Sequence, residues 1–177
     1  MNKQGLIQVF YGNGKGKTSI AVGSIIRALN YTDKICLFKF FKIKNNSGED
    51  KILESLNVEI YFSEYKHPFF YYNNITESLK NKIFEYQKEM FLNAAVKISE
   101  EYDLVVLDEV LDLIKENIIT NDDLLKCLKK KNKKTNVILT GHYIDNKIIE
   151  YADLVSEVSK IKHYYDTGIV NVPSLDF

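Results

Sequence analysis

The sequence predicts an α/β fold in which a mostly parallel central sheet is flanked by helices. Short apolar runs alternate with longer segments of helical period along the 177 residues. Such alternation is typical of parallel sheets, whose neighbouring strands are joined by crossover helices. One run, Leu-Val-Val-Leu at residues 104–107, is entirely apolar, as expected of a strand covered on both faces. No linker rich in Pro, Gly or Ser interrupts the chain, so we expect one domain over residues 1–177.

The predicted elements follow one another in regular order. Strands are expected where apolar, β-branched or aromatic residues cluster, at residues 6–10, 35–38, 58–62, 104–107, 137–139 and 154–158. Helices are expected where apolar residues recur with helical period, at residues 17–29, 76–101 and 120–130. Thr120 and Asp123 have the spacing of a capping box, which indicates where the last of these helices begins.

Two segments match neither pattern. The polar residues 43–50 are expected to form a loop, and the aromatic-rich residues 63–75 have no clean period. Both follow predicted strands, and ligands of open α/β sheets bind beyond the carboxyl ends of the strands. Either segment is therefore a candidate for part of a binding site.

Composition and charge exclude several classes of protein. Lys and Arg together number 24, as do Asp and Glu, so no general electrostatic attraction to nucleic acid or to an anionic membrane is expected. Cys36 and Cys127 lie far apart, which argues against a disulfide framework or a zinc module. No apolar run approaches the roughly 18 residues of a membrane span, and the first residues lack the apolar stretch of a signal peptide. We expect a cytoplasmic enzyme or binding domain.

The strongest functional signal is a glycine-rich loop between the first predicted strand and helix, which is the context that a phosphate-binding P-loop requires. Its glycines let backbone amides converge on an anion, and the helix N-terminus adds partial positive charge. Lys17 can contact the outer phosphates, and the Thr18 hydroxyl can ligate Mg²⁺. The usual first glycine position is Tyr11, and the glycine comes one residue later. The motif predicts a P-loop NTPase-like (RecA-like) fold. The predicted phosphate-binding residues are Gly12, Asn13, Gly14, Lys15, Gly16, Lys17, Thr18 and Ser19.

A second signal is the pair Asp108 and Glu109 at the end of the apolar strand. Carboxylates at this position fit the metal-side element of P-loop proteins, where one of them helps to hold Mg²⁺. The alternative is a polar strand terminus or an N-cap for the following helix.

The only arginine, Arg27, lies ten residues beyond Lys17, about 15 Å along the helix. At that distance its side chain does not reach the loop that precedes its own helix. The simple alternative is that Arg27 is an ordinary surface residue, and the other is that its guanidinium binds a ligand with a geometry that a lysine ammonium cannot provide. The three histidines have no metal-ligand spacing.

Taken together, the sequence resembles the P-loop corrinoid adenosyltransferases, the cob(I)alamin or cob(I)yrinic acid a,c-diamide adenosyltransferase family. The most distinctive part is the loop with its late glycine at Gly12. The family's Thr-Gly-Arg is here Thr140-Gly141-His142, which replaces a permanent cation with a titratable one. The other matching segments, which extend the resemblance over almost the whole chain, are Arg27, Phe38-Lys-Phe-Phe-Lys42, Gly48-Glu49, Val105-Val-Leu-Asp-Glu-Val110, Val137-Ile-Leu-Thr-Gly141, Ala152-Asp-Leu-Val155, Ser156-Glu157, Lys160-Ile-Lys-His163, Gly168-Ile169 and Leu175-Asp176-Phe177.

The resemblance implies transfer of the 5′-deoxyadenosyl group of ATP to Co(I) of a reduced corrinoid, with release of triphosphate. It implies catalytic roles for Lys17 and Glu109, Mg²⁺ held by Thr18, Asp108 and Glu109, and a nucleotide-linked role for Arg27. It also implies a homodimer and a reduced flavoprotein as electron donor. The balanced charge, rather than the resemblance, leads us to expect no nucleic-acid or membrane partner.

The family uses apolar side chains to exclude the lower axial ligand of cobalt. The densest aromatic loop of this chain offers the candidates Phe69, Phe70, Tyr71 and Tyr72. The alternative is a loop that simply packs against the domain.

Two other functions remain open on the residues alone. One is a small P-loop kinase or ATPase, and the other is a nucleotide- or corrinoid-binding relative without turnover. The products distinguish them: triphosphate for adenosyl transfer, ADP for a kinase or ATPase, and none for a binder.

Overall fold

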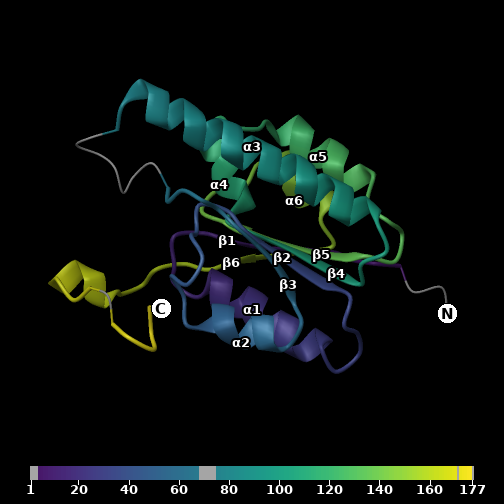
Figure 1. Cartoon of the computed structure of the whole chain (residues 1–177), viewed down its shortest axis with the longest axis horizontal. Coiled ribbons are helices and arrows are strands. Elements are labelled where there is room, and N and C mark those ends of the chain that lie inside the picture. Colours follow the sequence, from purple (N-terminus) through teal and green to yellow (C-terminus); the bar gives the residue numbers. More distant parts are fainter. Residues whose placement is uncertain (1–3, 68–74, 171, 177) are drawn as a thin grey trace.

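The computed structural model describes residues 4–67, 75–170 and 172–176, and within them a parallel six-stranded sheet forms the centre of the molecule (Figure 1). The strand order is β3-β2-β4-β5-β1-β6. The predicted α/β fold with a parallel central sheet is confirmed. The strands are β1 (Ile7–Tyr11), β2 (Ile35–Lys39), β3 (Glu59–Phe62), β4 (Leu104–Asp108), β5 (Asn136–Gly141) and β6 (Leu154–Glu157).

Helices cover both faces of the sheet. Figure 1 shows α1 (Lys17–Ala28) and α2 (Glu49–Ser55) on one face. The opposite face carries α3 (Glu77–Ser99), α4 (Val110–Lys115), α5 (Asn121–Lys129) and α6 (Asn146–Tyr151). The C-terminal segment stands off the body and contains the short 3₁₀ helix η2 (Tyr164–Thr167).

The two faces of the sheet build two separate cores. In β4, Val105 and Leu107 pack in the cluster under α3, α4 and α5, whereas Leu104 and Val106 pack in the cluster under α1 and α2. Successive side chains of a strand point to opposite faces. This double coverage therefore explains why the run at 104–107 is apolar without alternation.

The capping box is confirmed: the Thr120 side chain accepts from the Asp123 amide, and the Asp123 side chain accepts from the Thr120 amide. The prediction of a loop over residues 43–50 was wrong for its last two residues, because Glu49 and Asp50 lie in the first turn of α2. Acidic side chains favour a helix N-terminus, and both of these also pair with Lys39. The short helices α4 and α6 span less than two full turns each, too little to show a hydrophobic period.

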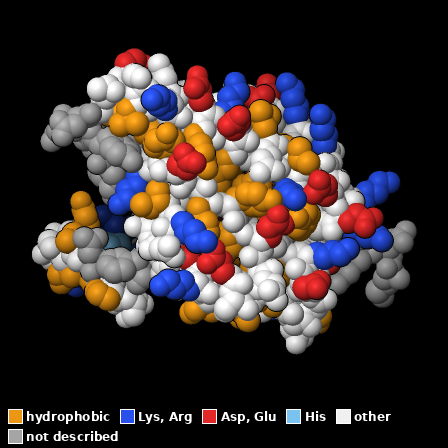
Figure 2. Space-filling view, viewed as in Figure 1, with side chains coloured by type: hydrophobic (Ala, Val, Ile, Leu, Met, Phe, Trp, Pro, Cys, Tyr) orange, Lys and Arg blue, Asp and Glu red, His pale blue; other side chains and the backbone are white. Residues whose placement is uncertain are grey.

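The surface is mixed in charge on the face built by α3 and α5. Figure 2 shows acidic and basic side chains interspersed there, with hydrophobic ones between them. This agrees with the net charge of zero. In the described part of the chain, no helix combines the length and apolar character needed to cross a membrane.

Candidate active site

The glycine-rich loop connects β1 to α1 and takes a shape that only glycine permits at two positions. Gly12 has φ +118° and Gly16 has φ +114°, values that side chains with a Cβ rarely adopt. The Gly14 amide donates to the Val158 carbonyl (2.7 Å), just beyond β6. A Cβ built on Gly12 or Gly14 would lie 2.6 Å from that same carbonyl oxygen. Close packing against the end of β6 thus requires glycine at both positions, whereas Tyr11 is still part of β1.

Lys17 is buried inside this loop. Its ammonium donates to the carbonyls of Gly12 (2.7 Å) and Gly14 (2.8 Å). Burial lowers the Lys17 pKa from its ordinary value, although nearby carboxylates, Asp112 first among them, act in the opposite direction. A partly desolvated cation at the N-terminus of a helix is suited to bind phosphate.

Asp108, the last residue of β4, is fully buried at the same edge of the sheet. It accepts hydrogen bonds from Thr18 Oγ1 (3.1 Å) and Thr140 Oγ1 (2.7 Å), and from the Lys42 ammonium (2.7 Å). Burial alone would raise the Asp108 pKa, but Lys42 and the Thr140 hydrogen bond outweigh it and lower that pKa. The carboxylate is therefore held in its charged form.

Glu109 follows directly and has a left-handed backbone, with φ +66°. Its amide donates to Thr140 Oγ1 (2.7 Å), and its carboxylate lies 3.2 Å from Lys42 Nζ. Burial raises the Glu109 pKa, and the like charge of Asp108 adds to the effect. Glu109 occupies the N-cap position of α4, but its side chain makes no capping hydrogen bond, so capping does not explain its side chain.

Lys42 is a further residue of the site, which the sequence analysis named only within a matching segment and for which it predicted no role. Its ammonium donates to Thr18 Oγ1 (2.8 Å) and contacts both Asp108 and Glu109. Burial opposes its charge, but the two carboxylates outweigh burial and raise the Lys42 pKa. The available signal was its place just after β2, since parallel strands bring their carboxyl ends to one edge of the sheet.

Two loop residues contact the C-terminal segment. Asn13 Oδ1 accepts from the Lys160 amide (2.9 Å). The Lys15 ammonium donates to Tyr164 Oη (2.6 Å) and pairs with Asp176. The C-terminal segment therefore packs beside the loop tip.

The remaining predicted residues lie on α1, beyond β5 or outside the described range. Ser19 is exposed on α1, and Arg27 is exposed in the last turn of that helix. His142 follows β5, and its Nδ1 lies 3.0 Å from the buried Asp112 carboxylate. The corrinoid-pocket candidates Phe69, Phe70, Tyr71 and Tyr72 lie outside the described residues.

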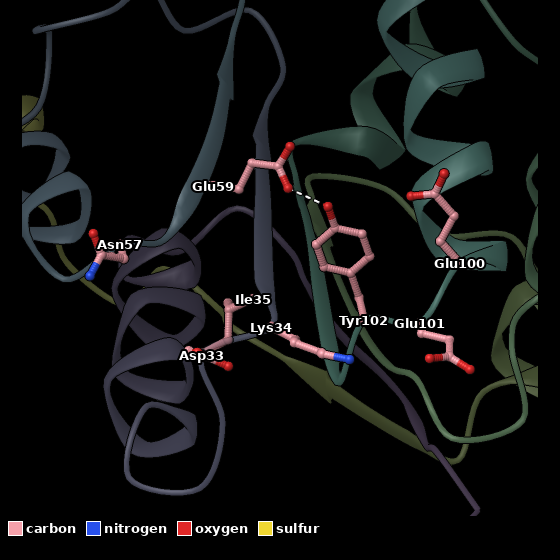
Figure 3. Close-up of a pocket in the computed structure, with 8 residues that line it drawn as sticks. All are labelled: Asp33, Lys34, Ile35, Asn57, Glu59, Glu100, Glu101 and Tyr102. Carbon is pink, nitrogen blue, oxygen red and sulfur yellow. Dashed lines mark hydrogen bonds between the residues drawn. The ribbon is translucent and has the colours of Figure 1, made fainter.

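A hollow of about 420 Å³ opens at the opposite edge of the sheet, near the beginnings of β2 and β3 (Figure 3). Figure 3 shows Glu59 and Tyr102 joined by a hydrogen bond at this hollow. Glu100 and Glu101 also line it. Its acidic lining and its position away from the glycine-rich loop make it unsuited to a triphosphate.

The arrangement at the loop combines an anion cradle with hard oxygen ligands. The Thr18 hydroxyl and the Asp108 carboxylate are oxygen donors of the type that Mg²⁺ prefers. Among the described residues, no three His, Cys, Asp or Glu side chains form a metal-binding group. A cation bound here would therefore take further ligands from phosphate oxygens and water.

Comparisons with known proteins agree with one another. Residues 3–177 match the sequence model of the family described as ATP:corrinoid adenosyltransferase BtuR/CobO/CobP. The chain is 28% identical to a corrinoid adenosyltransferase of Escherichia coli K12 over 177 residues, which cover 99% of this chain and 87% of that protein. It is 27% identical to corrinoid adenosyltransferases of Salmonella typhimurium and Pseudomonas aeruginosa, in each case over 99% of this chain and over 87% and 85% of those proteins.

Proposed function

The chain belongs to the ATP:corrinoid adenosyltransferase family, and from this premise we propose how its own residues carry out the transfer. The predicted class, a transferase that uses ATP and a corrinoid, is confirmed. We propose that the loop of residues 12–19 binds the triphosphate of ATP. The observation that carries this proposal is the buried Lys17 ammonium, which donates to two carbonyls of the glycine-rich loop.

The reaction forms a Co–C bond and breaks the bond between the 5′-carbon and its oxygen, so the electron pair departs with triphosphate. Co(I) is the nucleophile, and no protein base is required. The protein must align the 5′-carbon with cobalt and stabilise the charge that develops on the leaving group. Lys17 and the loop amides are proposed to supply that stabilisation.

We also propose that Thr18 and Asp108 hold Mg²⁺, with Glu109 beside them. The donor set fits: the Thr18 hydroxyl lies 3.1 Å from Asp108 Oδ1, and the Lys42 ammonium already contacts both side chains. A bound Mg²⁺ would neutralise charge on the leaving phosphates. Glu109 is proposed to stabilise the same cation by its charge.

Three finer assignments rest on the family resemblance. We propose a homodimer, a reduced flavoprotein as electron donor, and a nucleotide-linked role for Arg27. From the composition of the sequence we propose action in the cytoplasm. We retain the aromatic residues Phe69, Phe70 and Tyr71 as the proposed apolar wall of the corrinoid pocket. We also propose that residues 1–177 work as one domain.

The test is an anaerobic reaction of the protein with ATP, Mg²⁺ and chemically reduced cob(I)alamin. We expect adenosylcobalamin and triphosphate in equal amounts, measured by visible spectrum and by chromatography. Lys17→Ala should lower the rate on the order of 10²–10³-fold, as expected when a positioned charge donor is removed. Lys44→Ala is the matched control, since Lys44 is exposed and pairs with Glu54 on the surface.

The alternative functions give different products. ADP without corrinoid alkylation would assign a kinase or ATPase. ATP binding without any product would assign a binding protein, and His142→Arg would then be the next variant, because the family has arginine at this position.

A further inference from the structure

The Lys42 ammonium occupies the position that the metal site needs for its cation. It contacts Thr18 Oγ1 at 2.8 Å, Asp108 Oδ2 at 2.7 Å and Glu109 Oε1 at 3.2 Å. These side chains are the same three that were predicted from the sequence as metal ligands. A Mg²⁺ ion bound to these oxygens at its usual distance of about 2.1 Å would overlap with the ammonium group.

The backbone holds Lys42 in this place. Phe41 has a left-handed conformation, with φ +57°, which costs energy for a side chain with a Cβ. Buried Gln87 stabilises it: its Oε1 accepts from the Phe41 amide (3.3 Å), and its Nε2 donates to Ser63 Oγ (2.6 Å). The Ser63 amide in turn donates to the Lys42 carbonyl (2.9 Å). The turn is thus fixed on both sides of the Phe41–Lys42 peptide.

The neighbouring lysines make other contacts. Lys17 donates to the loop carbonyls, and Lys39 pairs with Glu49 and Asp50. Among the described residues, Lys42 is therefore the lysine whose ammonium contacts both Asp108 and Glu109 directly. Two adjacent, largely buried carboxylates without a cation would repel each other and pay a large desolvation cost.

From this geometry we infer that Lys42 is a positioning residue that serves as the internal cation of the nucleotide-free site, keeps free divalent ions out, and gives way when metal arrives with the phosphates. This inference rests on the proposed function of the loop. Charge and ligand number explain why the site excludes a free metal ion but accepts one that arrives with ATP. A free ion must displace a tethered ammonium without any gain in ligands, whereas ATP brings phosphate oxygens that can ligate the metal and accept hydrogen bonds from the released ammonium.

The test measures uptake of free Mn²⁺ by nucleotide-free protein, followed through the loss of the electron paramagnetic resonance signal of the aqueous ion. Lys42→Met should bind one Mn²⁺ at least about tenfold more tightly than the wild-type protein, a difference of about 1.4 kcal/mol. Lys42→Arg keeps a cation and should stay near wild type. Lys44→Met removes the same charge from an exposed position nearby and should also change nothing. Equal affinity in Lys42→Met and wild type would overturn the inference.

A second measurement does not depend on the folding of Lys42→Met. In ¹⁵N-lysine-labelled wild-type protein, the Lys42 ammonium signal, assigned with the Lys42→Arg protein, should shift on addition of MgATP and stay unchanged with Mg²⁺ alone. A shift with Mg²⁺ alone would refute exclusion of the free ion. Wild-type protein that binds no MgATP would contradict the proposed function itself. MgATP binding without the predicted Lys42 effects would contradict only the inference.

Discussion

Replacing Thr140 with valine removes the hydroxyl that contacts both the Asp108 carboxylate and the Glu109 amide, and keeps the volume of the side chain. Thr140 is fully buried. Its Oγ1 donates to Asp108 Oδ1 (2.7 Å) and accepts from the Glu109 amide (2.7 Å). The substitution therefore weakens the solvation of a buried carboxylate and leaves a buried amide without this acceptor.

Each loss has a known size. A hydrogen bond to a charged group contributes roughly 1.5–3 kcal/mol, and a buried polar group left unsatisfied costs about 1–3 kcal/mol. The lower bounds together give a loss of about 2.5 kcal/mol in the free energy of unfolding. For a chain of this length, that loss lowers the melting temperature by roughly 5–10 °C.

Thr135→Val is the matched control. Thr135 is also fully buried and its hydroxyl donates to the Tyr102 carbonyl (2.6 Å), but it lies at the opposite edge of the sheet, and the hydrogen-bond partners of that hydroxyl are backbone carbonyls rather than charged side chains. Its loss should cost only about 1 kcal/mol. Urea unfolding of both variants at pH 7 measures the difference, and ATP binding should weaken in Thr140→Val alone. Equal unfolding free energies of the two variants would refute the argument.

The pH dependence gives an independent check. Because the Asp108 pKa is lowered in the folded protein, partly by the Thr140 hydrogen bond, its contribution to stability is present above the unfolded carboxyl pKa of about 4 and is lost as the pH falls through the folded value. Thr140→Val raises the folded pKa. The stability difference from wild type should therefore be largest near neutral pH and shrink in acid.

Three further predictions concern the loop, a helix cap and the thiols. Gly14→Ala should weaken ATP binding at least about tenfold, because its Cβ would press on the end of β6. In contrast, a Cβ at Gly23 in α1 would meet open space, so Gly23→Ala should raise the free energy of unfolding by about 0.4–1 kcal/mol. Calorimetry measures the ATP affinity of Gly14→Ala, and urea unfolding measures the stability of Gly23→Ala. Unchanged ATP affinity of Gly14→Ala would argue against close packing of the loop. Thr120→Ala removes the cap of α5 and should lower the free energy of unfolding by about 1 kcal/mol, so an unchanged urea midpoint would contradict the capping role. Burial raises the pKa of the Cys127 thiol to about 12 and also raises the pKa of Cys36. Iodoacetamide at pH 8 should therefore leave both thiols unmodified until urea is added. Rapid alkylation of the folded protein would contradict the burial of these two cysteines.

The strands were predictable because each is a local cluster of apolar residues. The same holds for the glycine-rich loop and for Asp108 and Glu109, whose chemistry is visible in neighbouring residues. The order of the strands was not predictable from local pattern, since β4 pairs with β2 although β3 comes between them in the chain, and β1 lies between β5 and β6.

Strand order is also the reason why the sequence predicted no site role for Lys42, Thr140 or Gln87. In the sequence, Lys42 is one lysine among many, and Gln87 is a polar residue whose burial on the packed face of α3 is not visible from its type. Their roles arise only when β2, β4 and β5 align, with Lys39 beside Asp108 in the register. The aligned ends bring the ammonium and the Thr140 hydroxyl to the same carboxylate.

The late glycine of the loop has a structural cause at the other end of the chain. Gly12 and Gly14 both lie against the backbone of Val158, and the Val158 amide donates to the Tyr11 carbonyl (2.7 Å). Tyr11 is therefore held in strand geometry by β6, and the left-handed turn can begin only at the next residue. Since the segment after β6 also contacts Asn13 and Lys15, the shape of the glycine-rich loop depends on the C-terminal part of the chain. The shifted glycine and the segment after β6 thus form one structural unit, and we expect a change in either to alter nucleotide binding.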